Sequence, residues 1–470
     1  MQVPARPDLM TVEDTIKLGH EDVAALTAKH VSPGQQRMLK LLGFDRLLID
    51  HAEGMYYVDQ GGRKILDFFG AYGALGFGHN HPRILAAERA FIDARRHDIA
   101  IAFMSQYAAV LSYDLAQVSP GDLDMAFLCV SGSEANEAAL KLGERAAGRR
   151  KPTLLYAEHS FHGKTRGALS VSDSDLYQAD FQLLQNRRKV PFGDAEALEK
   201  VLARDRSIGV FILETIQGGA GVVMPPKGYL KAVRELCDAH GVIWIADEVQ
   251  CGYGRTGRFF AFEHEDVVPD IATLAKSLGG GKTAVGAYVA RTPIFMNAYG
   301  TPQTALIHGP ATFGWIGTAC ATAIEALNTL YDEDLMGNAA EQGAYLLERL
   351  QFLQTKYPTL IADVRGRGLM VGLELSDISQ GMPRGTRTLV SSFDKRLRGA
   401  LTGFIGALLL SDYDILIAFT EYNRNVIRLE PPLIVERSHI DRLVESLDDL
   451  LSRGVTRIVL DYLRKTKLTH

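Results

Sequence analysis

The sequence predicts an α/β fold with a large, mostly parallel sheet and a second, smaller α+β domain. The chain has 470 residues, of which 47% are hydrophobic and 23% charged, so it can bury a large core. Its middle third alternates apolar, β-like runs with amphipathic helical patterns, which is typical of parallel strands covered by helices on both faces. Polar residues stand directly after these runs, where the carboxyl ends of strands form the ligand crevice of an open α/β sheet.

Five apolar segments are expected to be strands of this sheet: Met125–Val130, Thr153–Ala157, Val210–Leu213, Val242–Ala246 and Ile271–Ala275. The helical patterns between them cover Glu134–Ala147, Ala195–Ala203 and Tyr229–His240. The polar residues that follow the strands are Ser131-Gly132-Ser133, Glu158-His159, Glu214, Asp247-Glu248 and Lys276. These residues are expected to meet at one edge of the sheet.

After about residue 330 the pattern changes, because long helices at Leu335–Lys356 and Ile440–Ser452 surround short strands at Gly368–Leu373 and Val426–Leu429. The apolar stretch from Gly403 to Phe419 is too short and too charged to span a membrane, and we expect a helix end followed by a buried strand. The expected division is an N-terminal segment that joins the small domain, a large domain and a small C-terminal domain, over residues 1–65, 66–332 and 333–470.

Charge and cysteine content exclude several classes of protein. The net charge of −5 comes from 51 basic and 56 acidic residues without long runs of one sign, so nothing favours a nucleic acid or an anionic membrane as partner. The 4 cysteines form no C-x-x-C pair, which is typical of a reducing compartment. The N-terminal residues contain no apolar signal segment. A cytoplasmic location is expected.

The segment FLCVSGSEANEAALKLG reads as a strand, a turn and a helix. Ser131 and Glu134 fit the S-x-x-E capping box, so one interpretation is simply a capped helix. The other is that the free N–H groups of Gly132 and Ser133 hold a phosphate at the positive end of that helix. The segment alone leaves both open.

The segment DIATLAKSLGGGKT ends like a nucleotide-binding P-loop, but the pattern G-x-x-x-x-G-K-S/T requires glycine where this chain has Lys276. A P-loop hydrolase is therefore disfavoured. A lysine at the end of a buried strand is costly unless it is paired or deprotonated, and a desolvated lysine with a lowered pKa suits Schiff-base chemistry. The alternative is an ordinary surface lysine.

Asp247 and Glu248 follow five apolar residues and could either bind Mg²⁺ or direct a carboxylate at a heteroaromatic nitrogen. The segment does not decide between them. The histidines at 79, 81, 159 and 162 have spacings close to those of metal ligands, but they stand in turns beside glycine or proline. Structural histidines are favoured, and no metal is expected.

Taken together, these segments resemble the class III (ω-amino acid) aminotransferases, which use pyridoxal 5′-phosphate (PLP). The matching pieces occur in family order from about Gly70 to Leu433, and the look is closest to putrescine and ornithine aminotransferases. They are GHNHP, SGSEANEAALKL, SFHG, ETIQGGAG, ADEVQCGYGRTG, DIATLAKSLGGG, ATFGWIG and VIRLEPPL. The resemblance implies the PLP-dependent transferase fold type I, with a seven-stranded-type sheet, and a homodimer with shared active sites.

The resemblance also implies roles for residues around the cofactor. Lys276 would form the internal aldimine and shuttle the proton, and Asp247 would keep the pyridine nitrogen protonated. Phe161 and Val249 would pack on the two ring faces, and Gln250 would lie near the ring hydroxyl. The remaining contacts near the cofactor are assigned to His162 and Glu214.

At the two ends of the site, the resemblance implies phosphate and substrate contacts. Gly132 and Ser133 would bind the phosphate, together with Thr312 from the neighbouring subunit. Arg428 would bind a substrate carboxylate, and Tyr72 would lie in the wall of the substrate pocket.

The implied reaction moves an amino group from a terminal amine, such as a diamine or an ω-amino acid, to a keto acid such as 2-oxoglutarate or pyruvate. Ping-pong kinetics are expected. The alternatives are another PLP enzyme of the same family (an aminomutase, racemase or decarboxylase) and a non-catalytic member. Intact Lys276 and Asp247 count against the last of these.

The sequence departs from the family at two places. The family motif E-P-x-Q-G-E ends here in Gly219, whereas many members have a glutamate that gates the arginine matching Arg428. Our hypothesis is that Arg428 is either unpaired or gated by another acid. In ATFGWIG, bulky Trp315 and Ile316 replace a turn of small residues, and a contact with the core or with a second subunit is the favoured interpretation of Trp315.

Overall fold

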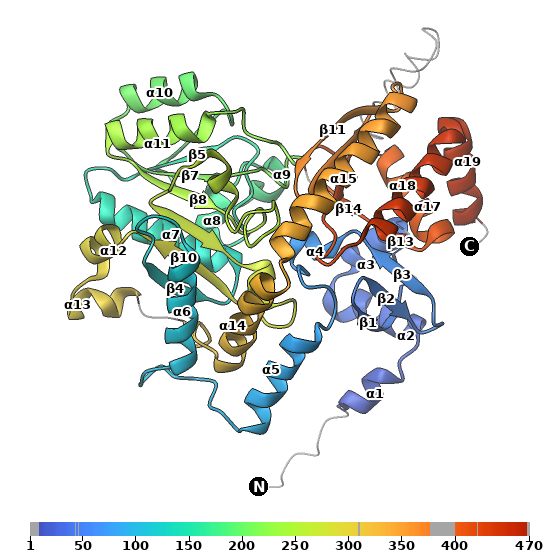
Figure 1. Cartoon of the computed structure of the whole chain (residues 1–470), viewed down its shortest axis with the longest axis horizontal. Helices are drawn as coiled ribbons and strands as arrows, with labels where there is room; N and C mark the ends of the chain where they lie inside the picture. The colour runs from blue at the N-terminus through green and yellow to red at the C-terminus, as the bar shows by residue number, and fades with distance from the viewer. Residues whose placement is uncertain are drawn as a thin grey trace.

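The computed structural model describes residues 9–42, 44–45, 47–308, 311–376, 400–420 and 422–467. Its largest sheet confirms the predicted α/β fold, and the expected strands are all present (Figure 1). The strand order is β4 (Met125–Cys129), β10 (Gly286–Ala290), β9 (Ile271–Leu274), β8 (Ile243–Asp247), β7 (Ile208–Glu214), β5 (Thr153–Ala157) and β6 (Arg187–Val190). Only β10 runs antiparallel to its neighbours, and β10 and β6 are the two strands missing from the sequence prediction.

Both faces of this sheet are buried, which explains why its strands are continuous apolar runs rather than alternating ones. Along β7, Val210 and Ile212 belong to one apolar cluster, and Phe211 and Leu213 belong to the other. The first face is covered by α7 (Gly132–Ala147) and α12 (Thr292–Tyr299). The second is covered by α6 (Gln106–Val118), α10 (Ala195–Arg204), α11 (Tyr229–His240) and α14 (Gly317–Asp332).

Strand register brings polar residues side by side at the carboxyl edge. Glu214 at the end of β7 pairs with Asp247 at the end of β8, and Asp247 pairs with Thr273 in β9. Parallel strands in register end together, so the side chains that follow them converge. The predicted convergence of polar residues at one edge is therefore present.

A second group of elements forms the smaller part of the molecule (Figure 1). Its antiparallel sheet has the order β11 (Ile361–Arg367), β12 (Met370–Leu375), β15 (Val426–Leu429) and β14 (Ala418–Phe419). The helices beside it are α15 (Leu335–Lys356), α17 (Ala400–Tyr413), α18 (Arg437–Ser452) and α19 (Gly454–Lys467). The prediction of a helix end followed by a strand between Gly403 and Phe419 is confirmed.

The N-terminal part meets the C-terminal part through a third sheet. Its order is β1 (Ile49–Glu53), β2 (Tyr56–Asp59), β3 (Lys64–Asp67) and β13 (Ile415–Leu416), with β13 parallel to β3. Helices α1 (Val12–Ile16), α2 (His20–Leu26) and α3 (Pro33–Leu42) precede it, and α5 (Pro82–Asp93) follows it. The domain boundaries at 65 and 332 stay a prediction.

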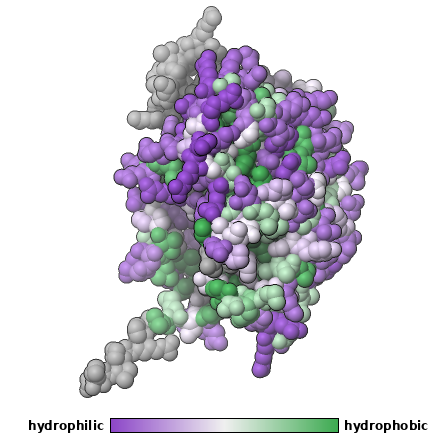
Figure 2. All heavy atoms as spheres, turned by 90° about the vertical axis from the view of Figure 1, so that its left-hand side faces the viewer, coloured by the Kyte–Doolittle hydropathy of each residue, from purple (hydrophilic) through white to green (hydrophobic). Residues whose placement is uncertain are grey.

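The surface is mixed in character. The face formed by the left-hand side of Figure 1 is largely hydrophilic, with apolar patches between the polar side chains (Figure 2). Among the described residues, no helix combines the length and the apolar character needed to cross a membrane.

Candidate active site

A cleft of about 550 Å³ lies at the carboxyl edge of the large sheet. Its wall contains most of the residues that the sequence singled out. These are Gly132, Ser133, Phe161, His162, Glu214, Asp247, Val249, Gln250 and Lys276. Tyr72, Thr312 and Arg428 are not in that wall.

The N-terminus of α7 opens onto this cleft. Ser131 is the N-cap, and its hydroxyl accepts the N–H of Glu134 at 3.2 Å. The predicted capping box is only half formed, because the Glu134 carboxylate accepts the N–H of Val130 at 2.7 Å, one residue before the cap. A Cβ on Gly132 would lie 2.8 Å from Val249 Cγ1, so a side chain there would fill the cleft. The helix end can therefore receive an anion at close range.

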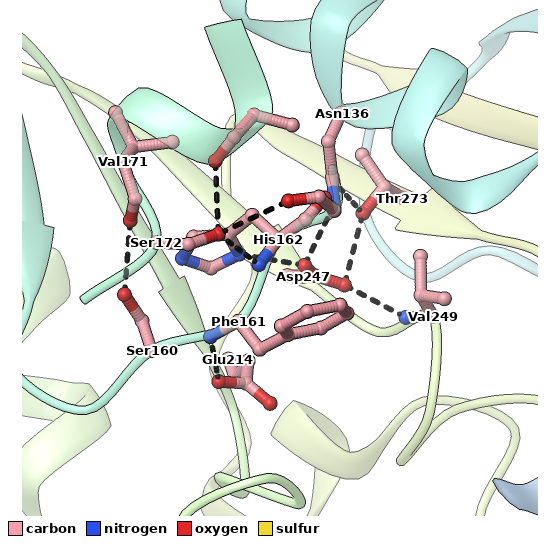
Figure 3. A network of polar contacts seen from close by, with 12 residues as sticks. Asn136, Ser160, Phe161, His162, Val171, Ser172, Glu214, Asp247, Val249 and Thr273 are labelled. Atoms are coloured by element: carbon pink, nitrogen blue, oxygen red, sulfur yellow. Dashed lines mark hydrogen bonds and ion pairs between the residues drawn. The ribbon is translucent and has the colours of Figure 1, made fainter. Parts of the chain in front are cut away.

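Asp247 lies on the cleft floor at 3% exposure, held by four neighbours (Figure 3). Its Oδ2 accepts the Asn136 side-chain amide at 2.8 Å and lies 2.7 Å from His162 Nδ1, which donates to it. Its Oδ1 accepts the N–H of Val249 at 3.0 Å and the more distant Thr273 hydroxyl at 3.4 Å. The carboxylate is thus fixed in one orientation before any ligand binds.

Asn136 was missed by the sequence analysis, although it links this network together. It also donates to the carbonyl oxygen of His162 at 2.8 Å and accepts the hydroxyl of Thr273 at 2.8 Å. The signal was present, because Asn136 is a polar residue on the face of α7 that is otherwise buried and apolar. A buried amide requires partners, and this one finds them in the cleft floor.

Asp247 and Glu248 do not act as a pair. The Glu248 carboxylate accepts the N–H groups of Ala261 and Phe262 at 2.8 and 3.1 Å, away from the Asp247 network. In the part of the chain that the structure describes, no group of three or more His, Cys, Asp or Glu side chains could hold a metal ion. The two carboxylates thus do not converge on one point, as the Mg²⁺ interpretation of Asp247-Glu248 requires, and the interpretation of Asp247 as a partner of a heteroaromatic nitrogen is favoured.

Glu214 supports the wall of the cleft. Its carboxylate accepts the N–H of Phe161 at 2.9 Å and the N–H of Gly218 at 3.2 Å, and so fixes the backbone at Phe161 (Figure 3). Burial, followed by the charge of the neighbouring Asp247, raises the pKa of Glu214 to about 8. A protonated Glu214 carries no charge, so it does not repel the Asp247 carboxylate at the end of the adjacent strand.

Lys276 stands two residues after the end of β9, and it lines the cleft. Its φ of 53° lies in the left-handed region, which is unfavourable for a residue with a side chain and often marks a functional site. Withdrawal from water lowers the pKa of Lys276 to about 8, despite the opposing effect of the Glu430 carboxylate. The surface-lysine interpretation is wrong, because this amine lines the cavity.

Arg428 lies in β15, behind the wall of the cleft. Its Nε lies 3.5 Å from Oε2 of Glu430, and the two side chains are 4% and 0% exposed. Its guanidinium carbon lies 4.5 Å from the ring centre of Tyr72, which covers it. The alternative of an unpaired Arg428 is wrong, because Glu430 pairs with it. The sequence analysis did not identify this acid.

Gly219, the position at which the sequence departs from the family motif, faces Tyr422. A Cβ at position 219 would lie 3.2 Å from the ring of Tyr422, whose hydroxyl donates to the carbonyl oxygen of Ser160 at 2.8 Å. A side chain at 219 would therefore have to displace that ring. Trp315, the other departure, packs against the large apolar cluster, which agrees with the expected core contact.

The matching family model is "Aminotransferase class-III", over residues 43–451. A curated relative, Aminotransferase PigE of Serratia sp., is 34% identical in a match that is 474 residues long and covers 95% of this chain. The chain spans about half (53%) of the length of that relative. A solved ornithine aminotransferase from Toxoplasma gondii is 28% identical with a TM-score of 0.79, covering 94% of this chain and 98% of that one.

Two further solved structures are similar over nearly their whole length. One is an (S)-enantioselective omega-transaminase from Thermomicrobium roseum, which is 26% identical with a TM-score of 0.79, covering 94% of this chain and 100% of that one. The other is an acetylornithine aminotransferase from Elizabethkingia anophelis, which is 28% identical with a TM-score of 0.72, covering 92% and 98%. The fold is the one shared by class III aminotransferases, the PLP fold type I. This chain belongs to the class III aminotransferase family.

Members of this family use PLP, and the residues of the cleft fit that cofactor. The α7 N-terminus at Gly132 offers backbone N–H groups to a phosphate. The buried carboxylate of Asp247 suits a protonated ring nitrogen, and Lys276 supplies an amine of lowered pKa. A Cβ on Gly163 would lie 2.3 Å from Ser133 Oγ, so the backbone at Gly163 keeps the phosphate end open.

Proposed function

We propose that this protein is a PLP-dependent aminotransferase that moves an amino group from a terminal amine to a keto acid. The observation that carries the proposal is the convergence of Lys276, Asp247 and the α7 N-terminus on one cleft. The curated relative is named an aminotransferase, and similar solved proteins are named ornithine aminotransferase and omega-transaminase. Those names support a diamine or ω-amino acid as donor and 2-oxoglutarate or pyruvate as acceptor.

PLP supplies an electron sink for the electron pair that remains when a proton leaves the carbon beside the substrate nitrogen. Asp247 would hold a proton on the ring nitrogen, which keeps the ring electron-poor. Lys276 Nζ would take that proton from the substrate carbon and return it, since its lowered pKa allows it to act as a base near neutral pH. Phe161, which Glu214 fixes through its N–H, would pack against one ring face.

The experiment is a transfer assay with PLP-loaded protein. Putrescine, ornithine, lysine, β-alanine and GABA, each labelled with ¹⁵N, are tested against 2-oxoglutarate and pyruvate, and labelled glutamate or alanine is measured by mass spectrometry. We expect label in the product amino acid with parallel double-reciprocal plots, as a ping-pong mechanism requires. Consumption of a donor without transfer of label would favour an aminomutase, racemase or decarboxylase instead.

Cofactor binding can be tested apart from turnover. Added PLP should give the protein a yellow colour, and borohydride should bleach it while fixing the cofactor to the peptide that contains Lys276. A colourless protein that takes up no PLP would contradict the proposal. The same result would leave a non-catalytic member of the family as the better interpretation.

We also propose a homodimer with shared active sites. The loop before α6 leaves Ile101, Phe103 and Met104 exposed by 56%, 56% and 93%, which is unusual for a monomer surface. Thr312 is exposed and outside its own cleft, so it is available to a second copy. Size-exclusion chromatography with light scattering should give a dimer, and Phe103→Glu with Met104→Glu should give a monomer of lower activity.

A cytoplasmic location is part of the proposal as well. It is supported by Cys129, Cys237, Cys251 and Cys320, all of which are free and buried. Fractionation of the native host, followed by immunoblotting, tests it. Recovery in the membrane or external fraction would contradict it.

A further inference from the structure

His308 is a buried histidine that has no role in the cleft described above. Its ring is 6% exposed and stacks on two other rings, with centroid distances of 4.1 Å to Tyr299 and 4.0 Å to Phe127. Its Nε2 is hydrogen-bonded to the hydroxyl of Tyr288. Burial lowers the pKa of His308 to about 4, so the ring is uncharged at neutral pH. These neighbours (the aromatic cage of Phe127, Tyr288 and Tyr299) fix the histidine in one orientation.

The aromatic cage belongs to the large sheet and to a helix that covers it. Phe127 in β4 and Tyr288 in β10 are direct partners in the antiparallel register of the sheet. Tyr299 is the last residue of α12, which packs on one face of that sheet. Tyr288 and Tyr299 are 0% and 4% exposed. Because closely packed elements move little, a residue held by the aromatic cage keeps its position relative to the sheet.

The chain segment after His308 reaches the surface. Ala311 and Thr312 are exposed, and Phe313 is 54% exposed. Thr312 also lies outside the cleft of its own subunit. An exposed segment makes few contacts of its own, so its position depends on the anchors at its two ends. His308 is the anchor at the upstream end.

The downstream anchor is a pair of hydrogen bonds to Asp98. The N–H of Gly317 donates to the carbonyl oxygen of Asp98 at 3.0 Å, and the N–H of Thr318 donates to its carboxylate at 2.9 Å. Trp315 adds a contact with the large apolar cluster. Asp98 stands just before the exposed loop that we propose as a dimer surface, so the segment is tied to that surface. The exposed residues thus have a fixed anchor on either side.

We propose that His308 is a positioning residue for the partner subunit's cleft. Held in the aromatic cage, it fixes the segment that presents Thr312 to the phosphate end of that cleft. A hydroxyl stabilises a phosphate only within hydrogen-bond distance, so a small displacement of the segment removes the contact. This inference rests on the proposed homodimer with shared active sites, and it assigns the support of Thr312 to one buried side chain.

The alternative is an effect on the cleft of the same subunit. Phe127 of the aromatic cage lies in β4, which leads through Ser131 to Gly132 at the N-terminus of α7. A change at His308 could therefore reach the phosphate end of its own cleft through β4. A dimer that carries different substitutions in its two subunits separates the two routes.

The first measurement compares homodimers and does not depend on turnover. PLP-loaded protein is transferred to cofactor-free buffer, and the loss of its yellow absorbance is followed. PLP should leave His308→Ala about 10-fold faster than wild type, which corresponds to one lost hydrogen bond to a charged group. Pyridoxal, which has no phosphate, should leave both proteins at rates within about twofold of each other.

His264→Ala is the matched control for this measurement. Burial likewise lowers the pKa of His264 to about 4, and its Nε2 contacts Thr256 instead of the aromatic cage. PLP should leave this variant at the wild-type rate. Faster release from both histidine variants would indicate a general loss of packing and would overturn the inference.

The decisive measurement uses a mixed dimer of one Lys276→Ala subunit and one His308→Ala subunit, which are co-expressed with different tags and purified on both. Only one cleft keeps Lys276, so the yellow absorbance reports that cleft alone. The subunit opposite that cleft has an intact His308. If His308 acts on the partner's cleft, the mixed dimer releases PLP at the wild-type rate. If it acts on its own cleft, the mixed dimer keeps the fast release of His308→Ala.

Fast release from the mixed dimer would overturn the inference, and so would wild-type release from the His308→Ala homodimer or an equal acceleration for pyridoxal. If His308→Ala fails to fold, Tyr288→Phe replaces it in both measurements, because it removes only the hydroxyl contact and should accelerate release by about two- to threefold. Unchanged release in Tyr288→Phe would overturn the inference in the same way. A wild type that is monomeric in light scattering contradicts the proposed homodimer and this inference with it. A dimeric wild type whose mixed dimer keeps the fast release contradicts this inference alone.

Discussion

Two polar clusters belong to the candidate site, one in the wall of the cleft and one behind that wall, and they are built differently. The Asp247 cluster (Asp247 with Asn136, His162, Val249 and Thr273) holds its carboxylate through three contacts of 2.7–3.0 Å and one of 3.4 Å. The Arg428 pair (Arg428 with Glu430) holds its guanidinium through contacts of 3.4 and 3.5 Å. The first cluster is rigid before ligand binding, while the second is loosely closed.

The origin of the elements explains this contrast. The Asp247 cluster comes from adjacent strands of the large sheet, the helix α7 and a loop that follows β5, so backbone register fixes the distances. In the Arg428 pair, Arg428 lies in β15 of the small sheet and contacts Tyr72, while Glu430 directly follows β15 and contacts Gln250. A fixed carboxylate suits a cofactor that stays bound, and a movable pair suits substrates that exchange.

The largest effect is expected at Lys276, whose amine feels the charges of both clusters. Lys276→Ala removes the group that moves the proton, and transfer of the amino group should fall by about 10³-fold or more. The ¹⁵N transfer assay measures it. Lys356→Ala is the control, because Lys356 pairs with Asp448 on the surface, 2.8 Å away. Activity within tenfold of wild type in Lys276→Ala would contradict the assigned role.

Asp247→Asn tests the rigid cluster. The substitution keeps the shape but removes the negative charge, so kcat should fall by about 100-fold, as for the loss of other preorganised electrostatic contacts. The KM for the keto acid should change little. Asp441→Asn is the control, because Asp441 pairs with Arg349 away from the cleft. A raised KM with an unchanged kcat in Asp247→Asn would contradict separate roles for the two clusters.

Arg428→Gln tests the loose pair with the opposite expectation. The KM for 2-oxoglutarate should rise by about 10-fold or more, because a charge-assisted contact to its carboxylate is lost. The rate of the amine-donor half-reaction should stay near wild type. Stopped-flow measurement of each half-reaction separates the two values, with Arg437→Gln as control. Equal losses in both half-reactions would contradict a role limited to acidic substrates.

Glu214→Gln should have the smallest effect on turnover, because it acts on stability. The pKa of Glu214 is raised to about 8, so the folded state keeps a proton that the unfolded state loses above about pH 4.5. Wild-type stability from this group is therefore complete below pH 4.5 and is lost as the pH rises toward 8. In urea denaturation, the free energy of unfolding of Glu214→Gln should rise relative to that of the wild type between pH 5 and 8. The rise should be at most about 1.4 kcal/mol per pH unit. A constant difference would contradict the raised pKa.

Much of the fold and of the cofactor end of the site was predictable, because local patterns carry it. Apolar runs and amphipathic periods located the strands and the long helices, and α15 matches its predicted range. Lys276 and Asp247 were singled out by their positions directly after predicted buried strands, and the roles expected of them came from the family resemblance. Two strands escaped this reasoning. The edge strand β6 reads Arg-Arg-Lys-Val, with too few apolar residues to be recognised, and β10, which lies between β4 and β9, follows a glycine-rich turn.

Residues that act through distant contacts could not be predicted in this way. Asn136 and Thr273 become partners of Asp247 only through packing of α7 on the sheet and through strand register. Glu430 stands two residues after Arg428, and such a spacing says nothing about pairing, because alternate side chains in a strand share a face without having to touch. The Glu430 carboxylate is held by the side-chain amide of Gln250, which lies 180 positions away in the chain.

The sequence by itself therefore determined the α/β architecture, the lysine and the aspartate, and the missing glutamate at Gly219. Apolar periodicity and the end of each buried strand are local properties, so they can be recognised from neighbouring residues in the chain without knowledge of the fold. The tertiary structure alone decided that Glu430 faces Arg428 and that Tyr72 covers it. Charge pairing of buried groups depends on distances between elements far apart in the chain, and only the packed fold sets those distances.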